Sequence, residues 1–101
     1  MSTEHPQVSI LDNPDRYRFE ARVGDEVAGV LTYIREEGVA VYPHTKVQPA
    51  FEGRGIGGLL TKAALDDARE RNLLVDPQCP FIAAWIRKNP AYKDLVVTRS
   101  A

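Results

Sequence analysis

The sequence predicts a mixed α/β fold, in which antiparallel strands are followed by a glycine loop, a helix, a parallel strand and a second helix. Before residue 53 the apolar residues recur mainly with the period of two that is typical of strands, and from Ile56 on they recur with the period of a helix. A cluster of glycines, Gly53–Gly58, separates the two patterns. Because 101 residues bury enough surface for one core, we expect a single domain over residues 1–101.

Three strands are expected to form an antiparallel meander before the glycines. Alternation predicts a half-buried strand over Arg16–Val23, with Glu20 among arginines on its polar face. Val27–Ile34 is largely apolar at both alternating sets of positions, so we expect a central strand covered on both faces. Val39–Val47 is rich in β-branched residues but contains Pro43, which has no N–H for a ladder. The strand should bulge or leave its neighbour there.

The second half predicts two helices around a short buried strand. An amphipathic helix is expected from Ile56 to about Arg71, followed by a strand at Leu73–Val75. A crossover helix joins that strand to Val39–Val47, so the two should be parallel. A second helix is expected over Pro80–Lys88, and its buried side chains should be Phe81, Ile82, Trp85 and Ile86. Further edge strands are expected at Val8–Leu11 and Leu95–Val97.

Composition excludes several classes of partner. With 13 basic and 14 acidic side chains the net charge is -1, so no global positive field attracts nucleic acid or an anionic membrane. No apolar run approaches the roughly 20 residues of a membrane span and no signal segment is recognisable, so we expect a cytoplasmic protein. The single cysteine, Cys79, has no second cysteine for an intrachain disulfide. One cysteine also does not supply the set of about four ligands that a structural zinc site needs. We expect no metal.

The glycine cluster predicts an anion-binding loop. Glycine weakens a helix by roughly 1 kcal/mol relative to alanine, so glycines at a strand-to-helix junction need a reason. The bare backbone N–H groups of Gly53–Gly58 can approach a bulky anion such as a pyrophosphate, and the following helix adds unpaired donors and roughly +0.5 charge. Arg54 adds a positive charge at the rim. The competing interpretation is a tight turn with close packing of the helix on the sheet.

Three phosphate-binding motifs compete for this segment. A Walker A loop fails, because Leu59 follows Gly58 where that motif needs lysine. A dinucleotide fingerprint matches at Gly53-x-Gly55-x-x-Gly58, and Asp76 ends the next strand where a ribose-binding acid is expected. That fingerprint normally opens a fold of several βαβ units, whereas here an antiparallel meander precedes it.

The third motif resembles the coenzyme signature of the GNAT superfamily of N-acetyltransferases, Gln/Arg-x-x-Gly-x-Gly/Ala. Four segments together resemble the short branch of that superfamily, whose members are about the length of this chain and lack the long helices between the first two strands. These segments are His44–Val47, Phe51–Gly57, Asp76–Phe81 and Asn89–Tyr92. The resemblance spans about Arg16 to Val96. Glu52 departs from it, because larger relatives carry Gln or Arg there and an acid beside a pyrophosphate is unfavourable unless it points away.

The resemblance implies a GNAT-like fold around a mixed sheet that binds acetyl-coenzyme A (acetyl-CoA). The coenzyme would lie where the Val39–Val47 and Leu73–Val75 strands splay apart, with backbone amides near Val47 on its pantetheine arm and the glycine loop on its pyrophosphate. The coenzyme-binding residues so implied are Thr45, Lys46, Val47, Gly53, Arg54, Gly55, Ile56, Gly57, Gly58, Asn89 and Tyr92.

Two side chains are candidates for catalysis. Cys79 directly precedes the Pro80 helix, whose N-terminus should lower the pKa of a thiol. The resemblance places it near the acetyl group as an acid, a base or a transient acyl acceptor, whereas the competing interpretation is a small packing residue. His44 titrates near neutrality and is a candidate base or substrate contact, or a surface residue of the strand.

We therefore expect an acetyl-CoA-dependent N-acetyltransferase that acts on an amine of a small molecule or a protein. Two alternatives remain open, a non-catalytic acyl-CoA binding module and a dinucleotide-binding protein. A monomer or weak homodimer is expected, with no nucleic-acid or membrane partner.

Overall fold

The computed structural model describes residues 7–97, and the statements below concern that part of the chain. Five strands form one sheet in the order β1-β2-β3-β4-β5, antiparallel except for the parallel pair β4 and β5. The strands are β1 (Val8–Asn13), β2 (Arg18–Val23), β3 (Glu26–Glu36), β4 (Val39–Val47) and β5 (Leu74–Asp76), and the helices are α1 (Ile56–Glu70) and α2 (Pro80–Lys88). The predicted mixed sheet and both helices are confirmed.

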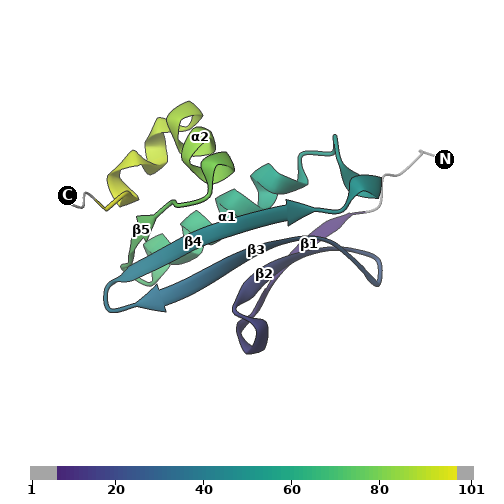
Figure 1. The fold of residues 1–101 in the computed structure, drawn as a ribbon, viewed down its shortest axis with the longest axis horizontal. Coiled ribbons are helices and arrows are strands. Elements are labelled where there is room, and N and C mark those ends of the chain that lie inside the picture. Colours follow the sequence, from purple (N-terminus) through teal and green to yellow (C-terminus); the bar gives the residue numbers. More distant parts are fainter. Residues whose placement is uncertain (1–6, 98–101) are drawn as a thin grey trace.

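Both helices lie on one side of the sheet, where the core forms (Figure 1). The stripe of α1 that contains Ile56, Leu60 and Ala64 is buried against the sheet. Full burial of a side chain the size of Ile56 or Leu60 contributes roughly 1.5–3 kcal/mol, so the stripe is a main source of stability. Among residues 7–97 no helix covers the opposite face, which we call the open face. No helix in this range is long and apolar enough to cross a membrane.

Three details of the sequence prediction are wrong. Strand β2 begins at Arg18 rather than Arg16, because a 3-10 turn over Pro14–Arg16 ends at Tyr17 in a left-handed conformation with φ 54°. Strand β3 is covered on one face only, and Ile34 is 52% exposed on the other side of the strand. The last expected edge strand is a 3-10 helix, Pro90–Leu95, followed by a single bridge between residues 75 and 96.

Strand β4 bulges at Pro43 and then leaves β5, as the missing proline N–H predicts. Thr32 pairs with His44 and Ile34 pairs with Val41, so two residues of β4 stand opposite one residue of β3. Strand β5 pairs only with residues 39–41 of β4. The backbone N–H of Cys79 donates to the carbonyl of Tyr42 at 3.0 Å, just beyond the last pair. Past this point no strand among residues 7–97 pairs with the outer edge of β4, and we call the separation between this edge and the start of α2 the notch.

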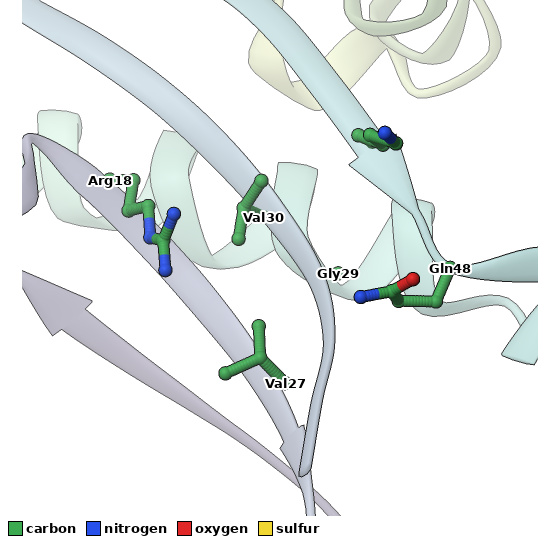
Figure 2. Close-up of a pocket in the computed structure, with 6 residues that line it drawn as sticks. Arg18, Val27, Gly29, Val30 and Gln48 are labelled. Atoms are coloured by element: carbon green, nitrogen blue, oxygen red, sulfur yellow. The ribbon is translucent and has the colours of Figure 1, made fainter.

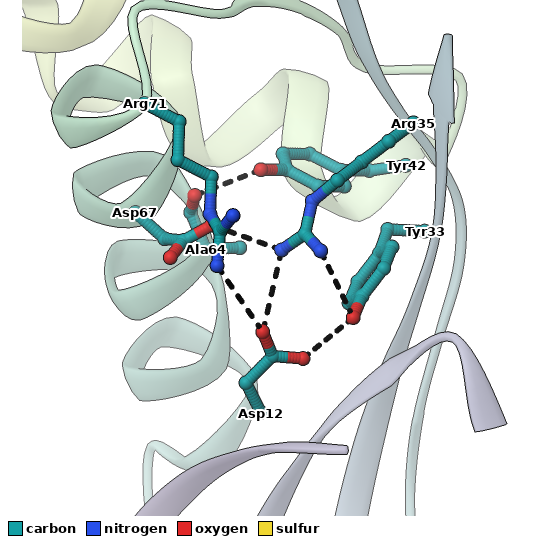
Figure 3. A network of polar contacts seen from close by, with 7 residues as sticks. All are labelled: Asp12, Tyr33, Arg35, Tyr42, Ala64, Asp67 and Arg71. Atoms are coloured by element: carbon teal, nitrogen blue, oxygen red, sulfur yellow. Dashed lines mark hydrogen bonds and ion pairs between the residues drawn. The ribbon is translucent and has the colours of Figure 1, made fainter. Parts of the chain in front are cut away.

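A polar network fastens the second half of α1 to β1 and β3 (Figure 3). The hydroxyl of Tyr33 donates to Asp12 at 2.6 Å, and the guanidinium of Arg35 reaches both Asp12 at 3.3 Å and Asp67 at 3.1 Å. Arg71 closes the network by donating to Asp67 at 2.9 Å. Burial and the bond to Asp12 raise the pKa of Tyr33 to about 12, so its hydroxyl stays a donor at neutral pH. The network fixes the angle of α1 on the sheet.

Glu20 lies on the open face, as expected, but it is buried, with 2% of its surface exposed. Arg18 and Arg22 each donate to its carboxylate at 2.8 Å, and Asn13 donates at 3.0 Å. The hydrogen bond from Arg22 is the largest influence on its pKa; with those from Arg18 and Asn13 it outweighs the opposing effect of burial and lowers the pKa to about 2. The three charged side chains therefore form one unit in which the glutamate remains ionised.

This unit predicts that the free energy of unfolding falls as the pH is lowered. Because the pKa of Glu20 is lowered in the folded state, its ionised form stabilises the fold above pH 4.5, and this stabilisation is lost as the pH falls toward 2. We expect the free energy of unfolding, measured by urea denaturation, to fall more steeply over this range in the native protein than in Glu20→Gln. Equal slopes would contradict the prediction. Glu70→Gln, at an exposed end of α1, is the matched control.

Candidate functional site

The glycine loop divides into two pairs with different physical roles. Gly53 and Gly55 adopt left-handed conformations, with φ of 83° and 74°. A Cβ atom built on either would meet no atom within 4 Å, so backbone conformation and not crowding requires glycine there. Gly55 is also the N-cap of α1. This pair turns the chain from β4 into the helix and leaves the loop backbone open.

The second pair allows the two helices to approach each other. A Cβ atom on Gly57 would lie 2.9 Å from Cζ of Phe81, and one on Gly58 would lie 3.2 Å from Nε1 of Trp85. Both distances are shorter than ordinary van der Waals contact. The packing interpretation weighed above therefore applies to Gly57 and Gly58, although their partner is α2 and not the sheet.

A pocket of about 230 Å³ opens over the glycine loop, and its other walls are Val47, Phe51, Glu52 and Phe81. The first helical hydrogen bond of α1 runs from the N–H of Leu59 to the carbonyl of Gly55 at 3.1 Å. The N–H groups of residues 56–58 precede that bond and therefore have no partner within the helix. They carry the positive end of the helix dipole to the pocket.

Two charged side chains stand at this pocket. The guanidinium of Arg54 lies 5.2 Å from the centre of the Phe51 ring, which holds a positive charge beside the loop. Glu52 lines the pocket and is exposed. The pocket therefore has favourable backbone donors and one cation, opposed by one carboxylate.

Phe81 was expected in the core, and this expectation is wrong. Its ring is 47% exposed because it lies over Gly57 at the pocket and not beneath α2. The helical pattern could not reveal this, because a position next to the buried Ile82 is equally compatible with a core and with a pocket wall.

Cys79 lies in the notch between β4 and α2, and 6% of its surface is exposed. Its thiol donates to Oγ1 of Thr45 at 3.7 Å. Burial, the largest single influence, opposes ionisation. It is outweighed by hydrogen bonds that the thiolate accepts from the Ile82 N–H, from the Thr45 hydroxyl, which accepts from the neutral thiol but donates to the thiolate, and from the N–H groups of Phe81 and Thr45. The pKa of Cys79 is therefore lowered from its ordinary value. The predicted cysteine thus faces a converging set of donors from two elements.

The register of β4 decides which of its residues face this notch. The N–H of Gln48 donates to the carbonyl of Ala28 at 2.8 Å, toward β3. Backbone groups alternate along a strand, so the N–H groups of Thr45 and Val47 point the other way, into the notch. The N–H of Thr45 acts on Cys79, as this alternation requires. Two of the predicted coenzyme-binding residues thus direct their amides into the notch, that of Thr45 toward Cys79 and that of Val47 at the glycine-loop pocket.

The alternation of residues along β4 directs the other two candidates on this strand, His44 and Lys46, away from the notch. His44 and Lys46 alternate with Thr45 and Val47, so their backbone N–H groups point toward β3, as that of Gln48 does. Their side chains are exposed on the open face of the sheet. The structure therefore brings Thr45, not His44, next to Cys79.

Asn89 and Tyr92, the last predicted coenzyme contacts, hold the far end of α2. The side-chain amide of Asn89 donates to the carbonyl of Trp85 at 2.8 Å and ends the helix. The hydroxyl of Tyr92 donates to Asp66 on α1 at 2.7 Å, a bond that raises the pKa of the tyrosine. Its ring packs against Trp85 with centroids 5.4 Å apart. Neither side chain lines the glycine-loop pocket.

One glycine that matters was not singled out by its sequence context. A Cβ atom on Gly29 would lie 3.1 Å from the carbonyl of Lys46 and 3.2 Å from Cγ2 of Ile56. Gly29 therefore lets the first turn of α1 approach β3 and β4. A glycine inside an otherwise apolar strand is the signal that marks such a close approach.

No metal centre accompanies this site. Within residues 7–97, no three or more His, Cys, Asp or Glu side chains are grouped so that they could hold a metal ion.

Comparison with known proteins is consistent across sequence and structure. Residues 18–95 match the family described as GCN5-related N-acetyl-transferase. The protein named NATD1 from Xenopus tropicalis is 34% identical over 90 residues, which cover 84% of this chain and 82% of that protein.

Two solved structures share the fold. A GCN5-like protein from Staphylococcus aureus, solved by NMR, matches with a TM-score of 0.70 and 24% identity over 91% of this chain and 90% of that one. Ard1 from Thermoplasma volcanium matches with a TM-score of 0.55 and 24% identity over 75% of this chain and 53% of that one. At these identities the likeness establishes the fold alone, and the predicted GNAT-like fold is confirmed.

The two roles of the glycines predict different costs of substitution. Gly55→Ala forces a Cβ atom into a left-handed conformation and should reduce the free energy of unfolding by about 1–2 kcal/mol. Gly57→Ala should cost less, because alanine favours the helix by roughly 1 kcal/mol and the half-exposed Phe81 ring can move aside. Urea denaturation measures both. A larger loss for Gly57→Ala than for Gly55→Ala would contradict this assignment.

The donors around Cys79 predict a thiol that ionises more readily than an ordinary cysteine. Thr45→Val removes the hydroxyl and should raise the pKa of Cys79, so that thiolate absorbance in the ultraviolet develops at higher pH than in the native protein. Thr32→Val, on β3 with its hydroxyl bonded to the carbonyl of His44, is the matched control and should leave the titration unchanged. An unchanged titration in Thr45→Val would exclude the hydroxyl as a cause.

Proposed function

The chain belongs to the GCN5-related N-acetyltransferase family, and we propose that it binds acetyl-CoA and transfers the acetyl group to an amine. Membership of the family supports acetyl transfer in general. The observation that carries the proposal for this chain is a pocket whose walls include both Val47 and the first turn of α1. The N–H of Val47 and the N–H groups of residues 56–58, which have no partner within the helix, therefore lie around one cavity, and Thr45 precedes Val47 on the same edge of β4.

The glycine loop is proposed to hold the pyrophosphate of the coenzyme. Gly53 and Gly55 leave the loop backbone without obstruction, and the N–H groups of residues 56–58 are free to donate to anionic oxygens. Arg54 supplies a cation at the same rim. The residues present therefore fit a pyrophosphate, apart from Glu52.

The notch is proposed to hold the pantetheine arm. Acetyl-CoA, when bound, supplies an acetyl group activated as a thioester. The N–H groups of Thr45 and Val47 donate along the arm and are suited to polarise a carbonyl oxygen, because they are fixed in position by the pairing of their neighbours with β3. The ring of Phe81 excludes water from one side of the pocket.

Cys79 and His44 are proposed to handle protons on opposite sides of β4. A lowered pKa makes the proton of Cys79 easier to lose and its thiolate easier to form, so we propose that Cys79 acts as the acid, the base or the transient acyl acceptor considered above. His44 is exposed on the open face, where it is suited to take a proton from an approaching ammonium. Asn89 and Tyr92 are proposed to act by fixing α2, which supplies Cys79 and Phe81.

A non-catalytic acyl-CoA binding module is the second candidate, and the observation that favours it is that His44 and Cys79 lie on opposite sides of β4. A dinucleotide binder is less well supported, because an antiparallel meander precedes the loop and Gln78 donates to the carboxylate of Asp76 at 3.3 Å. The remaining parts of the proposal are an amine acceptor on a small molecule or protein, a monomer or weak homodimer, and a cytoplasmic location.

Calorimetric titration tests the proposed coenzyme. We expect acetyl-CoA and coenzyme A to bind with one-to-one stoichiometry and NADH not to bind. Arg54→Gln should weaken coenzyme binding severalfold, since it removes a charge-assisted contact to the phosphates. Arg87→Gln, which removes one positive charge from α2, is the control. Binding of NADH in place of acetyl-CoA would overturn the proposal.

Glu52 predicts a gain of affinity. Glu52→Gln removes a negative charge from the wall of the pocket, and one charge pair at about 4 Å in water is worth about 1 kcal/mol, so acetyl-CoA should bind about fivefold more tightly. Raising the salt concentration should reduce the difference between the two proteins. Weaker or equal binding in Glu52→Gln would show that this carboxylate does not face the coenzyme.

A further inference from the structure

The open face of the sheet carries an ordered array of side chains that coenzyme binding does not use. Strand registers place Arg18, Thr32 and His44 in one row across β2, β3 and β4. The next row holds Glu20, Val30 and Lys46. Side chains that are cross-strand neighbours on one face of a sheet lie close together, so the two rows form one continuous surface.

A pocket of about 270 Å³ lies in this array, and α1 passes behind the sheet at this point (Figure 2). Its lining comes from three strands and the residue after β4, and consists of Arg18, Val27, Gly29, Val30, Lys46 and Gln48. The valines give it an apolar floor and the other side chains give it hydrogen-bond donors. Its volume lies just below the range of roughly 300–1,000 Å³ for ligand pockets, which indicates a small occupant.

The charge of this pocket is positive although the chain as a whole is slightly acidic. The carboxylate of Glu20 is already satisfied by two arginines, so this group of three carries a net charge of about +1. Arg18 uses only its Nε in that contact, at 2.8 Å, which leaves its terminal nitrogens available. The side chain of Lys46 forms no hydrogen bond or ion pair with any residue between 7 and 97. The pocket is therefore lined by the ammonium of Lys46 and by a guanidinium, that of Arg18, which shares the single charge of Glu20 with Arg22.

The pocket lies across one strand from the notch. Lys46 follows Thr45 directly, and alternation puts Lys46 on the open face and Thr45 beside Cys79. Past Tyr42 no strand among residues 7–97 pairs with the outer edge of β4. A molecule anchored at Lys46 can therefore extend past His44 over this free edge to the notch.

We propose that this pocket binds the anionic group, a carboxylate or a phosphate, of the amine that accepts the acetyl group. The inference rests on the proposed function and adds the chemical class of the acceptor. The anion is held by Arg18 and Lys46, the carbon skeleton lies over Val27 and Val30, and the amine extends toward His44. An extended polyanion such as a nucleic acid is disfavoured, because the two cations occupy a single small pocket.

NMR titration of the full chain tests this assignment without requiring turnover. The probes are O-phosphoethanolamine, β-alanine and ethanolamine, which share an aminoethyl group and differ in bearing a phosphate, a carboxylate or neither. At least one anionic probe should shift the backbone amide signals of Gly29, Val30 and Lys46, and ethanolamine should not. Equal shifts with ethanolamine, or no shift with either anionic probe, would overturn the inference.

Variants at the exposed Lys46 identify the contact. Lys46→Gln should weaken binding of the anionic probe at least tenfold, since it removes a charge-assisted hydrogen bond, and Lys46→Arg should retain binding. Lys93→Gln, an exposed lysine on the 3-10 helix Pro90–Leu95, is the charge-matched control and should bind as the native protein does. Equal weakening by Lys46→Gln and Lys93→Gln would indicate only a nonspecific charge effect and would also overturn the inference.

Titration with acetyl-CoA separates this inference from the proposed function. Coenzyme binding should shift the amides of residues 53–58 in the native protein and in Lys46→Gln alike. Failure of the coenzyme to bind, with the anionic probes still bound, would overturn the proposed function and the acceptor role but retain the anion pocket. At saturating acetyl-CoA, kcat/KM for the anionic probe that binds should exceed kcat/KM for ethanolamine about tenfold. Lys46→Gln should make the two values equal.

Discussion

The candidate site depends on the separation of β4 from β5. Pro43 offers no N–H to a neighbouring strand, β4 bulges there, and β5 pairs with three residues of β4 only. A continuous ladder would occupy the backbone amides of Thr45 and Val47 and close the notch. Because β4 stays paired with β3 on its other edge, the freed amides are fixed and not mobile. The separation therefore yields a rigid set of donors, the arrangement that electrostatic stabilisation of a carbonyl requires.

Close packing of the two helices brings the rest of the site to this notch. Gly57 and Gly58 let α2 lie against the first turn of α1, which sets Phe81 over the glycine loop and Cys79 beside Thr45. The far end of α2 is held by the bond from Tyr92 to Asp66. The glycines thus serve both interpretations raised by the sequence, with one pair shaping an open loop and the other allowing helix packing. The open face of the sheet remains for a second ligand.

The sequence predicts most of this architecture because hydrophobic period and turn chemistry are local. The bounds of β4 and α2, the bulge at Pro43 and the parallel β5 all follow from such signals. What it does not predict depends on contacts between distant segments. Glu20 is buried because two arginines surround it, and His44 is separated from Cys79 because strand register turns its side chain to the other face. Neither outcome is encoded in spacing along the chain.

A crystal structure of the chain with acetyl-CoA would show directly whether the glycine loop and the notch form the coenzyme site. We expect pyrophosphate oxygens about 3 Å from the N–H groups of residues 56–58, and the thioester carbonyl in the notch within reach of the Thr45 or Val47 amide. A coenzyme bound with its pyrophosphate away from the glycine loop, or with its arm outside the notch between β4 and α2, would contradict this expectation.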